Sequence, residues 1–125
     1  MIKQTFRING VDYSSHVRDN GVRRLFNPVK GLPDKMTEDN VNHIDFRGYK
    51  RTITVSFNPT DEDTTHAIID AYTSGLQFIT IYDTKTKADI TFLAEPATAA
   101  DAPEVVDEGG DITHYQIADL IYKEV

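Results

Sequence analysis

The chain has 125 residues and a mass of 14.1 kDa, so residues 1–125 have the size of a single domain with one hydrophobic core. It contains no cysteine, which excludes disulfide-stabilised mini-proteins and thiolate zinc sites. The net charge of −7 argues against nucleic-acid binding, and the lack of an apolar run of roughly 20 residues argues against a membrane span.

The first 40 residues predict a β-hairpin followed by a long loop. Residues 2–8 favour a strand, and Asn9-Gly10 is a strong turn signal because both residues tolerate positive φ. Residues 11–17 would return as a short second strand. Several turn dipeptides then follow in close succession and predict a turn-rich loop over about residues 18–40. A loop this long in a small domain is functional or is ordered by a partner.

The middle of the chain predicts a strand and then the only helix that we expect. Strand signal resumes at about Val41 and is clearest at residues 52–57, where apolar and hydroxyl residues alternate. A helix over about residues 61–74 follows. Thr60 or Asp61 would cap it, the acidic first turn suits the positive end of the helix dipole, and a Ser-Gly pair would end it.

The second half of the chain predicts further strands and a second long loop. Residues 76–82 are mostly apolar, as in a central strand covered on both faces, and a polar turn leads to a strand at 88–94. Residues 95–111 are rich in Ala, Pro, Gly and acidic side chains, and we expect an acidic loop that is mobile or ordered by a partner. The segment 111–125 is expected to be the closing strand, with a helix as the alternative.

These elements predict a mainly β fold of the α+β class. We expect an antiparallel β-sandwich or barrel-like domain with one short helix and long loops. Such a domain buries one face of each strand, and its loops remain available for contacts.

No group of residues has the spacing of a catalytic or metal site. The four histidines lie far apart, and the pair His43 and Asp45 cannot fill a four-coordinate site alone. The serines have no GxSxG context, and Gly109-Gly110 lacks the Lys of a phosphate-binding loop. The acidic residues at 61–63 fit helix capping better than acid–base chemistry. We therefore expect no enzyme activity, no cofactor and no metal.

Aromatic residues are candidates for the core and for contacts with partners. Phe57, Phe78 and Phe92 occupy alternating strand positions and are expected in the core. Phe26 lies in the turn-rich segment, and two roles are predicted for its side chain. It contacts a neighbouring subunit, or it packs under its own loop.

Charge is distributed unevenly along the chain. Residues 17–51 contain eight Lys and Arg against five acidic residues, whereas residues 52–125 contain three against fourteen. The pattern fits an ordinary solvated surface whose signs mix in the fold, and the acidic loop lacks the spacing of a calcium loop. It also fits electrostatic complementarity between identical copies in a ring or stack. The candidate interface residues in that case are Arg18, Arg23, Arg24, Phe26, Lys30, Asp101, Glu104, Asp107 and Glu108.

Three parts of the sequence resemble small structural proteins encoded in the tail and baseplate modules of tailed bacteriophages, prophages and phage-tail-like particles. The first is the opening FRINGVDYSSHV at 6–17. The second is KRTITVSF at 50–57, followed by the expected helix and by FITIYD at 78–83. The third is the TF pair at 91–92 with the closing IYKE at 121–124. The acidic loop is longer than this resemblance leads us to expect, which leaves the position within the tail open.

The resemblance implies a non-enzymatic virion component of the tail tube, the tail terminus or the baseplate. It implies rings or stacks of identical copies and contacts with other tail or baseplate proteins. Because the opening residues MIKQTFRING lack the apolar region of a secretory signal, we expect synthesis in the bacterial cytoplasm without a signal peptide. The resemblance implies no catalytic residues, no cofactor and no sequence-specific nucleic-acid binding. The alternative is a carbohydrate- or host-surface-binding module at the tail tip, in which Tyr13, Tyr49 or Phe26 stacks on sugars.

Overall fold

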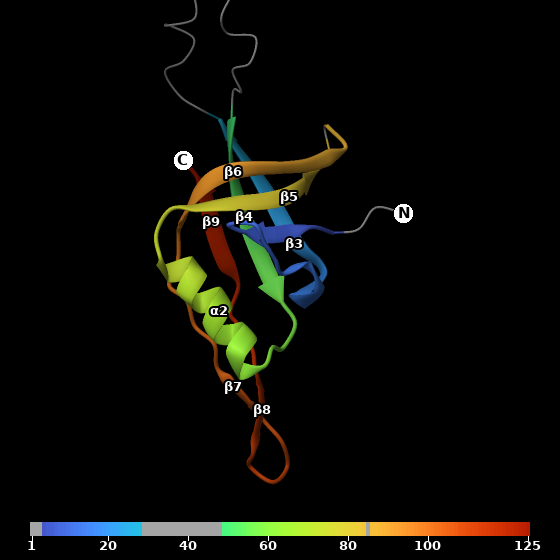
Figure 1. Ribbon diagram of the computed structural model, residues 1–125, viewed down its shortest axis with the longest axis vertical. Helices are drawn as coiled ribbons and strands as arrows, with labels where there is room; N and C mark the ends of the chain where they lie inside the picture. The colour runs from blue at the N-terminus through green and yellow to red at the C-terminus, as the bar shows by residue number, and fades with distance from the viewer. Residues whose placement is uncertain (1–3, 29–48, 85) are drawn as a thin grey trace, which may run out of the picture.

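The computed structural model of the protein describes residues 4–28, 49–84 and 86–125 (Figure 1). In these ranges the chain forms one seven-stranded antiparallel sheet, in the order β2-β1-β5-β6-β9-β4-β3, and a separate two-stranded sheet of β7 and β8. One α-helix accompanies them in the described residues. The predicted fold class, mainly β with one short helix, is confirmed.

The first half of the sheet begins with the predicted hairpin. β1 (Phe6–Ile8) and β2 (Val11–Asp12) are joined by Asn9 and Gly10, whose φ angles of 50° and 84° suit a tight hairpin turn. The second strand is shorter than predicted. Ser14 ends it because its backbone N–H donates to Asp12 Oδ1 at 2.9 Å, and a 3-10 helix, η1 (Ser14–His16), follows.

Two longer strands complete this half of the sheet. β5 (Gln77–Asp83) pairs with β1 on one side and with β6 (Ala88–Pro96) on the other. β5 is not apolar on both faces, which corrects the prediction. Gln77 takes an inward position, where its Nε2 donates to the carbonyl oxygen of Tyr72 at 2.7 Å, and Phe78 points outward with 56% of its surface exposed.

The second half of the sheet contains the strand that the sequence did not predict. β3 (Val17–Pro28) pairs with β4 (Tyr49–Phe57), so the expected turn-rich loop over 18–40 is wrong for residues 18–28. Asn20-Gly21 does not end the strand. It lies where the pairing register with β4 shifts, between Val17 and Val22, and Asn20 has a φ of 58°. Residues 29–40, and the strand signal from Val41 to 48, lie outside the described residues.

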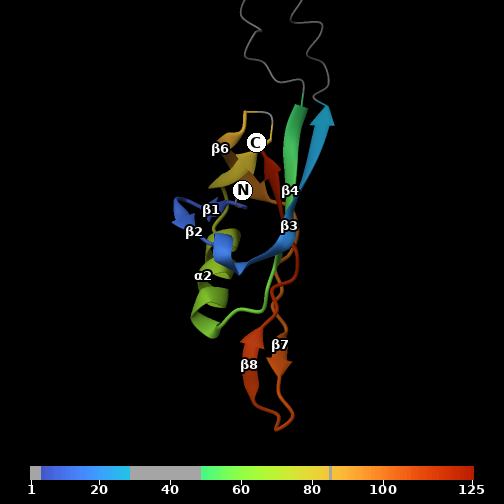
Figure 2. The same ribbon diagram turned by 90° about the vertical axis from the view of Figure 1, so that its right-hand side faces the viewer.

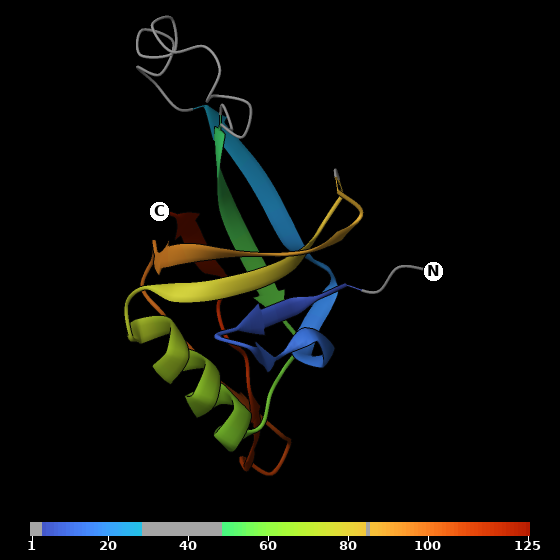
Figure 3. The same cartoon turned by 45° about the horizontal axis from the view of Figure 1, so that its top comes forward.

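β9 (Leu120–Glu124) joins the two halves, because it pairs with β6 on one side and with β4 on the other. Figures 2 and 3 show that β1, β5 and β6 cross over β3, β4 and β9, so the sheet curls into two layers. The core fills the space between the layers and beside the helix. Its fully buried members include Phe6, Ile8, Ile53, Val55, Phe57, Ile68, Tyr72, Ile79, Ile81, Ile117, Leu120 and Tyr122.

The helix α2 (Glu62–Thr73) matches the predicted span of about 61–74. Asp61 is the N-cap, since its Oδ1 accepts a hydrogen bond from the Thr64 backbone N–H at 2.8 Å. The buried face of the helix includes Tyr72, whose hydroxyl donates to the carbonyl oxygen of Ile121 at 2.8 Å. No helix in the described residues has the length and apolar character needed to cross a membrane.

The last third of the chain departs from the prediction in two places. The expected acidic loop over 95–111 begins inside β6 and contains a strand, β7 (Glu104–Val106). The expected single closing strand is divided into β8 (Ile112–Tyr115) and β9. β7 and β8 form a hairpin, and a two-residue bridge between Thr60 and Tyr115, with hydrogen bonds of 2.7 and 2.8 Å, anchors it to the body.

Candidate functional site

Two hairpins extend from opposite ends of the long axis of the molecule (Figure 1). The first, called here the basic arm, consists of residues 23–28 of β3 and 49–54 of β4. It contains Arg23, Arg24, Lys50 and Arg51 and no acidic residue. The second, the acidic arm, consists of residues 104–115. It contains four acidic residues and neither Lys nor Arg. Within the described residues, the fold therefore places unlike charges at opposite ends.

An exposed aromatic pair lies on the basic arm. The rings of Phe26 and Tyr49 meet edge to face with their centroids 5.0 Å apart, and Phe26 remains 46% exposed. Tyr49 also lies beside the Arg51 guanidinium, 5.5 Å from the ring centroid. Phe26 thus packs on its own hairpin and still offers an apolar surface to a partner.

A buried ion cluster fixes the base of the basic arm. The Arg51 guanidinium lies 3.7 Å from Asp83 Oδ1 and 3.7 Å from Glu124 Oε1, and all three side chains are at most 5% exposed. The backbone N–H of Arg51 also donates to Glu124 Oε1 at 2.8 Å. Because these residues lie on β4, β5 and β9, the cluster connects both layers of the sheet at the point where the arm begins.

The predicted basic interface residues have different surroundings. Arg24 is half-buried and donates to the carbonyl oxygen of Tyr82 at 2.6 Å, and burial lowers the pKa of its guanidinium, against the opposing effect of Asp83. Arg18 donates to the carbonyl oxygen of Phe57 at 3.3 Å. Arg23 is exposed and forms an ion pair with Asp119 at 2.8 Å. Arg18 and Arg23 are therefore more accessible to a partner than the half-buried Arg24.

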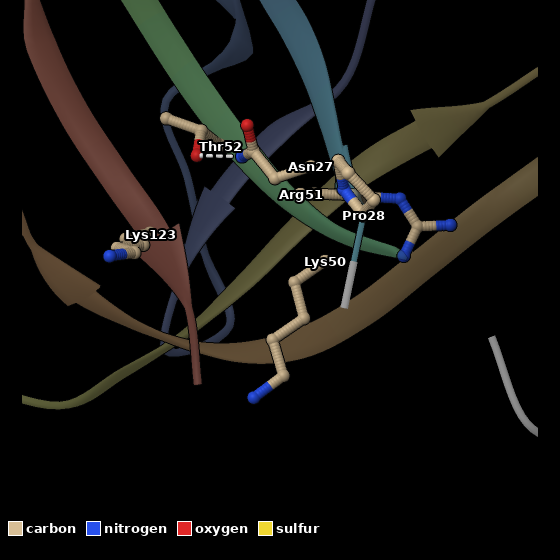
Figure 4. Close-up of a pocket in the computed structure, with 6 residues that line it drawn as sticks. All are labelled: Asn27, Pro28, Lys50, Arg51, Thr52 and Lys123. Atoms are coloured by element: carbon tan, nitrogen blue, oxygen red, sulfur yellow. Dashed lines mark hydrogen bonds between the residues drawn. The ribbon is translucent and has the colours of Figure 1, made fainter. Parts of the chain in front are cut away.

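A groove of about 620 Å³ lies on the outer face of the basic arm and is shown in Figure 4. Asn27 Nδ2 donates to Thr52 Oγ1 at 2.7 Å and fixes the groove wall. Lys50 and Lys123 lie on the same face as Thr52, away from the Arg51 guanidinium. The groove is lined by Asn27, Pro28, Lys50, Arg51, Thr52 and Lys123. Its two ammonium groups form no ion pair within the described residues, and Lys123 lies opposite the exposed Glu95 of β6.

The tip of the acidic arm is an ordered turn. Asp107 Oδ1 accepts hydrogen bonds from the backbone N–H groups of Gly109 and Asp111, each at 2.9 Å. The carboxylates of Glu108 and Asp111 accept no hydrogen bond or ion pair from described residues. Val106 and Ile112 flank the turn and are exposed. The tip therefore presents two free carboxylates between two apolar side chains.

The structure does not bring the predicted basic and acidic residues together in one chain. Arg23 and Arg24 are on the basic arm, whereas Glu104, Asp107 and Glu108 are on the acidic arm at the other end. Asp101 precedes the acidic arm, is exposed and accepts a hydrogen bond from the Ala118 N–H through its backbone carbonyl. Lys30 lies outside the described residues. Lys50 and Lys123 were missed, although outward positions on alternating strands are a signal for both.

The described residues contain no group of three or more His, Asp or Glu that could hold a metal ion. The pair His43 and Asp45 lies outside them. Asp61 acts as the predicted helix cap, and hydrogen bonds from Thr64 lower the pKa of its carboxyl. The capping assignment for the acidic residues at 61–63 is confirmed for Asp61.

Comparison with known proteins gives no relative. No family model, no curated protein and no solved structure matches this chain. Function must therefore be inferred from the two arms, from the groove and from the sequence segments that resemble tail proteins.

Proposed function

We propose that the protein is a non-enzymatic structural subunit of a bacteriophage tail or phage-tail-like particle, acting through contacts with other copies of itself and with other tail or baseplate proteins. The observation that carries the proposal is the pair of arms of opposite charge at opposite ends of the fold. The resemblance of the sequence segments 6–17, 50–57 and 78–83 to tail and baseplate proteins supports the assignment to a phage tail or a phage-tail-like particle.

The arrangement of the arms favours a head-to-tail assembly. Two identical acidic arms repel each other, as do two basic arms, so a symmetric contact between like ends is disfavoured. Where the acidic arm of one copy contacts the basic arm of the next without the reverse contact between the same two copies, the interface is heterologous, and repetition of it produces a closed ring or an open stack. Both arrangements suit a component repeated around or along a tail axis.

Sedimentation velocity and negative-stain microscopy of the purified protein, with and without the products of its neighbouring genes, test this proposal. We expect rings or stacks at low salt and partial dissociation as salt rises, because exposed charges farther apart than about 10 Å are largely screened at 0.1 M. A strict monomer that is also absent from assembled particles would refute it.

The second candidate function is a carbohydrate-binding module at the tail tip, and the exposed Phe26–Tyr49 pair is the observation in its favour. An aromatic face beside polar side chains suits stacking on a sugar ring. A glycan array with the parent protein and with Phe26→Ala checks it. Binding that is absent, or that Phe26→Ala leaves unchanged, would contradict a role for this pair.

A further inference from the structure

We propose that the tip of the acidic arm of one copy binds in the Lys50–Lys123 groove of the next copy. This inference rests on the proposed function as a self-assembling subunit and names the contact. It rests on the chemistry of the two surfaces, on their sizes and on their places in the fold.

The groove has the chemistry of an anion site. Lys50 and Lys123 come from β4 and β9, which are adjacent in the sheet, and Thr52 pairs directly with Lys123. Leu25 pairs with Thr52 from the other side and is exposed, so an apolar side chain lies next to the Thr52 wall of the groove. A partner that fits must offer carboxylates with an apolar side chain next to them.

The tip of the acidic arm has that chemistry. Glu108 and Asp111 are exposed, and Asp107 uses its carboxylate to hold the turn. Val106 and Ile112 supply the apolar neighbours. Because the turn is already ordered, binding costs little conformational entropy.

Size also favours the tip as the occupant. The groove holds about 620 Å³, within the roughly 300–1,000 Å³ of sites that enclose a drug-sized group. A two-stranded turn that inserts two or three side chains fits such a space. A nucleic acid is a poor alternative, because the chain as a whole carries a charge of −7.

Position decides between a contact within one chain and a contact between two. The groove is near the end of the molecule where β3 and β4 extend, and the tip is at the opposite end (Figures 1 and 4). A chain cannot place its own tip in its own groove. The contact therefore joins two copies. In a head-to-tail arrangement it leaves one free tip and one free groove for further copies.

Charge reversal with mixing tests the contact. One variant carries Lys50→Glu and Lys123→Glu, and the other carries Glu108→Lys and Asp111→Lys. All four side chains are exposed, so both variants should keep the parent circular dichroism spectrum. By sedimentation velocity we expect each variant alone to associate at least about tenfold more weakly than the parent, because like charges then face each other.

An equimolar mixture of the two variants should regain assembly. In the mixture each parent tip finds a parent groove, and each reversed tip finds a reversed groove. Lys87→Glu serves as the control for the groove variant, and Asp70→Lys with Asp89→Lys serves for the tip variant. These exposed positions lie outside both surfaces, and the controls should associate like the parent.

The outcomes separate the contact from the proposed function. A parent protein that assembles while both reversal variants assemble equally well would overturn the groove contact and leave the structural role standing. A parent protein that never associates would overturn both. Carbodiimide crosslinking of the assembled parent gives an independent check by mass spectrometry. We expect amide links from Glu108 or Asp111 to Lys50 or Lys123, and links confined to other pairs would overturn the contact.

Discussion

Replacement of Arg51 by Met tests whether the buried ion cluster holds the two layers together. Met keeps a similar apolar volume near Tyr49 and Phe92 but leaves Asp83 and Glu124 without the guanidinium that faces both. Removal of one member of a buried ion pair costs about 3–5 kcal/mol of unfolding free energy. The positive charge of Arg24 still interacts with the Asp83 carboxylate. We therefore expect a loss of unfolding free energy at the lower end of this range, about 3 kcal/mol.

Urea unfolding followed by far-UV circular dichroism and tyrosine fluorescence measures this loss, since the chain has no Trp. With a slope of about 2 kcal/mol per M, a loss of about 3 kcal/mol lowers the midpoint by about 1.5 M. Arg23→Met is the matched control. Its ion pair with Asp119 is shorter, at 2.8 Å, but the side chains are 61% and 50% exposed, so the expected loss is about 0–1 kcal/mol.

Two results would refute this account of the cluster. The first is a loss of unfolding free energy for Arg51→Met that is no larger than the loss for Arg23→Met. It would mean that water replaces the guanidinium as the partner of the Asp83 and Glu124 carboxylates. The second comes from the triple variant Arg51→Met, Asp83→Asn and Glu124→Gln. Because the carboxylates are neutralised together with the guanidinium, we expect it to regain most of the stability. A triple variant less stable than Arg51→Met alone would contradict the role of charge.

Phe57→Ala should cost about 3–5 kcal/mol because the ring is fully buried, whereas Phe78→Ala on the outer face should change stability by no more than about 0.5 kcal/mol. The same urea assay compares them, and equal losses would contradict the orientation of β5. Asp61→Ala tests the helix cap. Hydrogen bonds from Thr64 lower the pKa of Asp61 in the fold, so its contribution is full above the unfolded pKa of about 4 and is lost as pH falls through the lower folded value. The variant should therefore have a lower Tm than the parent at pH 7, and the difference should shrink as pH falls toward 2. A difference of the same size at both ends of this pH range would argue against a charged cap.

Local signals predicted the elements whose causes lie within a few residues. The turn at Asn9-Gly10 and the helix cap at Asp61 each depend only on the backbone of residues nearby in the chain. Both could therefore be predicted from the sequence. β3 was missed because Asn20-Gly21 was interpreted as a turn. The pair breaks a regular strand, but an irregular strand can continue through it. At this edge of the sheet the strand bulges, and a Cβ on Gly21 would lie 2.6 Å from the carbonyl oxygens of Arg18 and Ser56.

The candidate site depended more on distant partners. The exposed place of Arg23 and the acidic character of residues 104–111 follow from charge and composition, which the sequence shows. The pairing of β7 with β8, which makes this segment a hairpin, was not predicted. The surroundings of Arg24 do not follow from charge and composition either, because its acceptor on Tyr82 lies 58 residues away. The groove exists only because β4 pairs with β9, which brings Lys50 near Lys123. Pairing between distant strands cannot be read from periodicity, so this groove could not be predicted.

The central place of β9 has a consequence for the order of folding. β1, β5 and β6 can pair among themselves, and so can β3 and β4. Among the described strands, β9 alone pairs with both sets. During synthesis both sets leave the ribosome before residues 120–124, so the strand pairing that joins them is the last to become available. Closure of the sheet then depends on contacts between distant parts of the chain, which form slowly. The groove of the basic arm includes Lys123, so a nascent chain would complete the proposed assembly surface in the same step that completes its sheet.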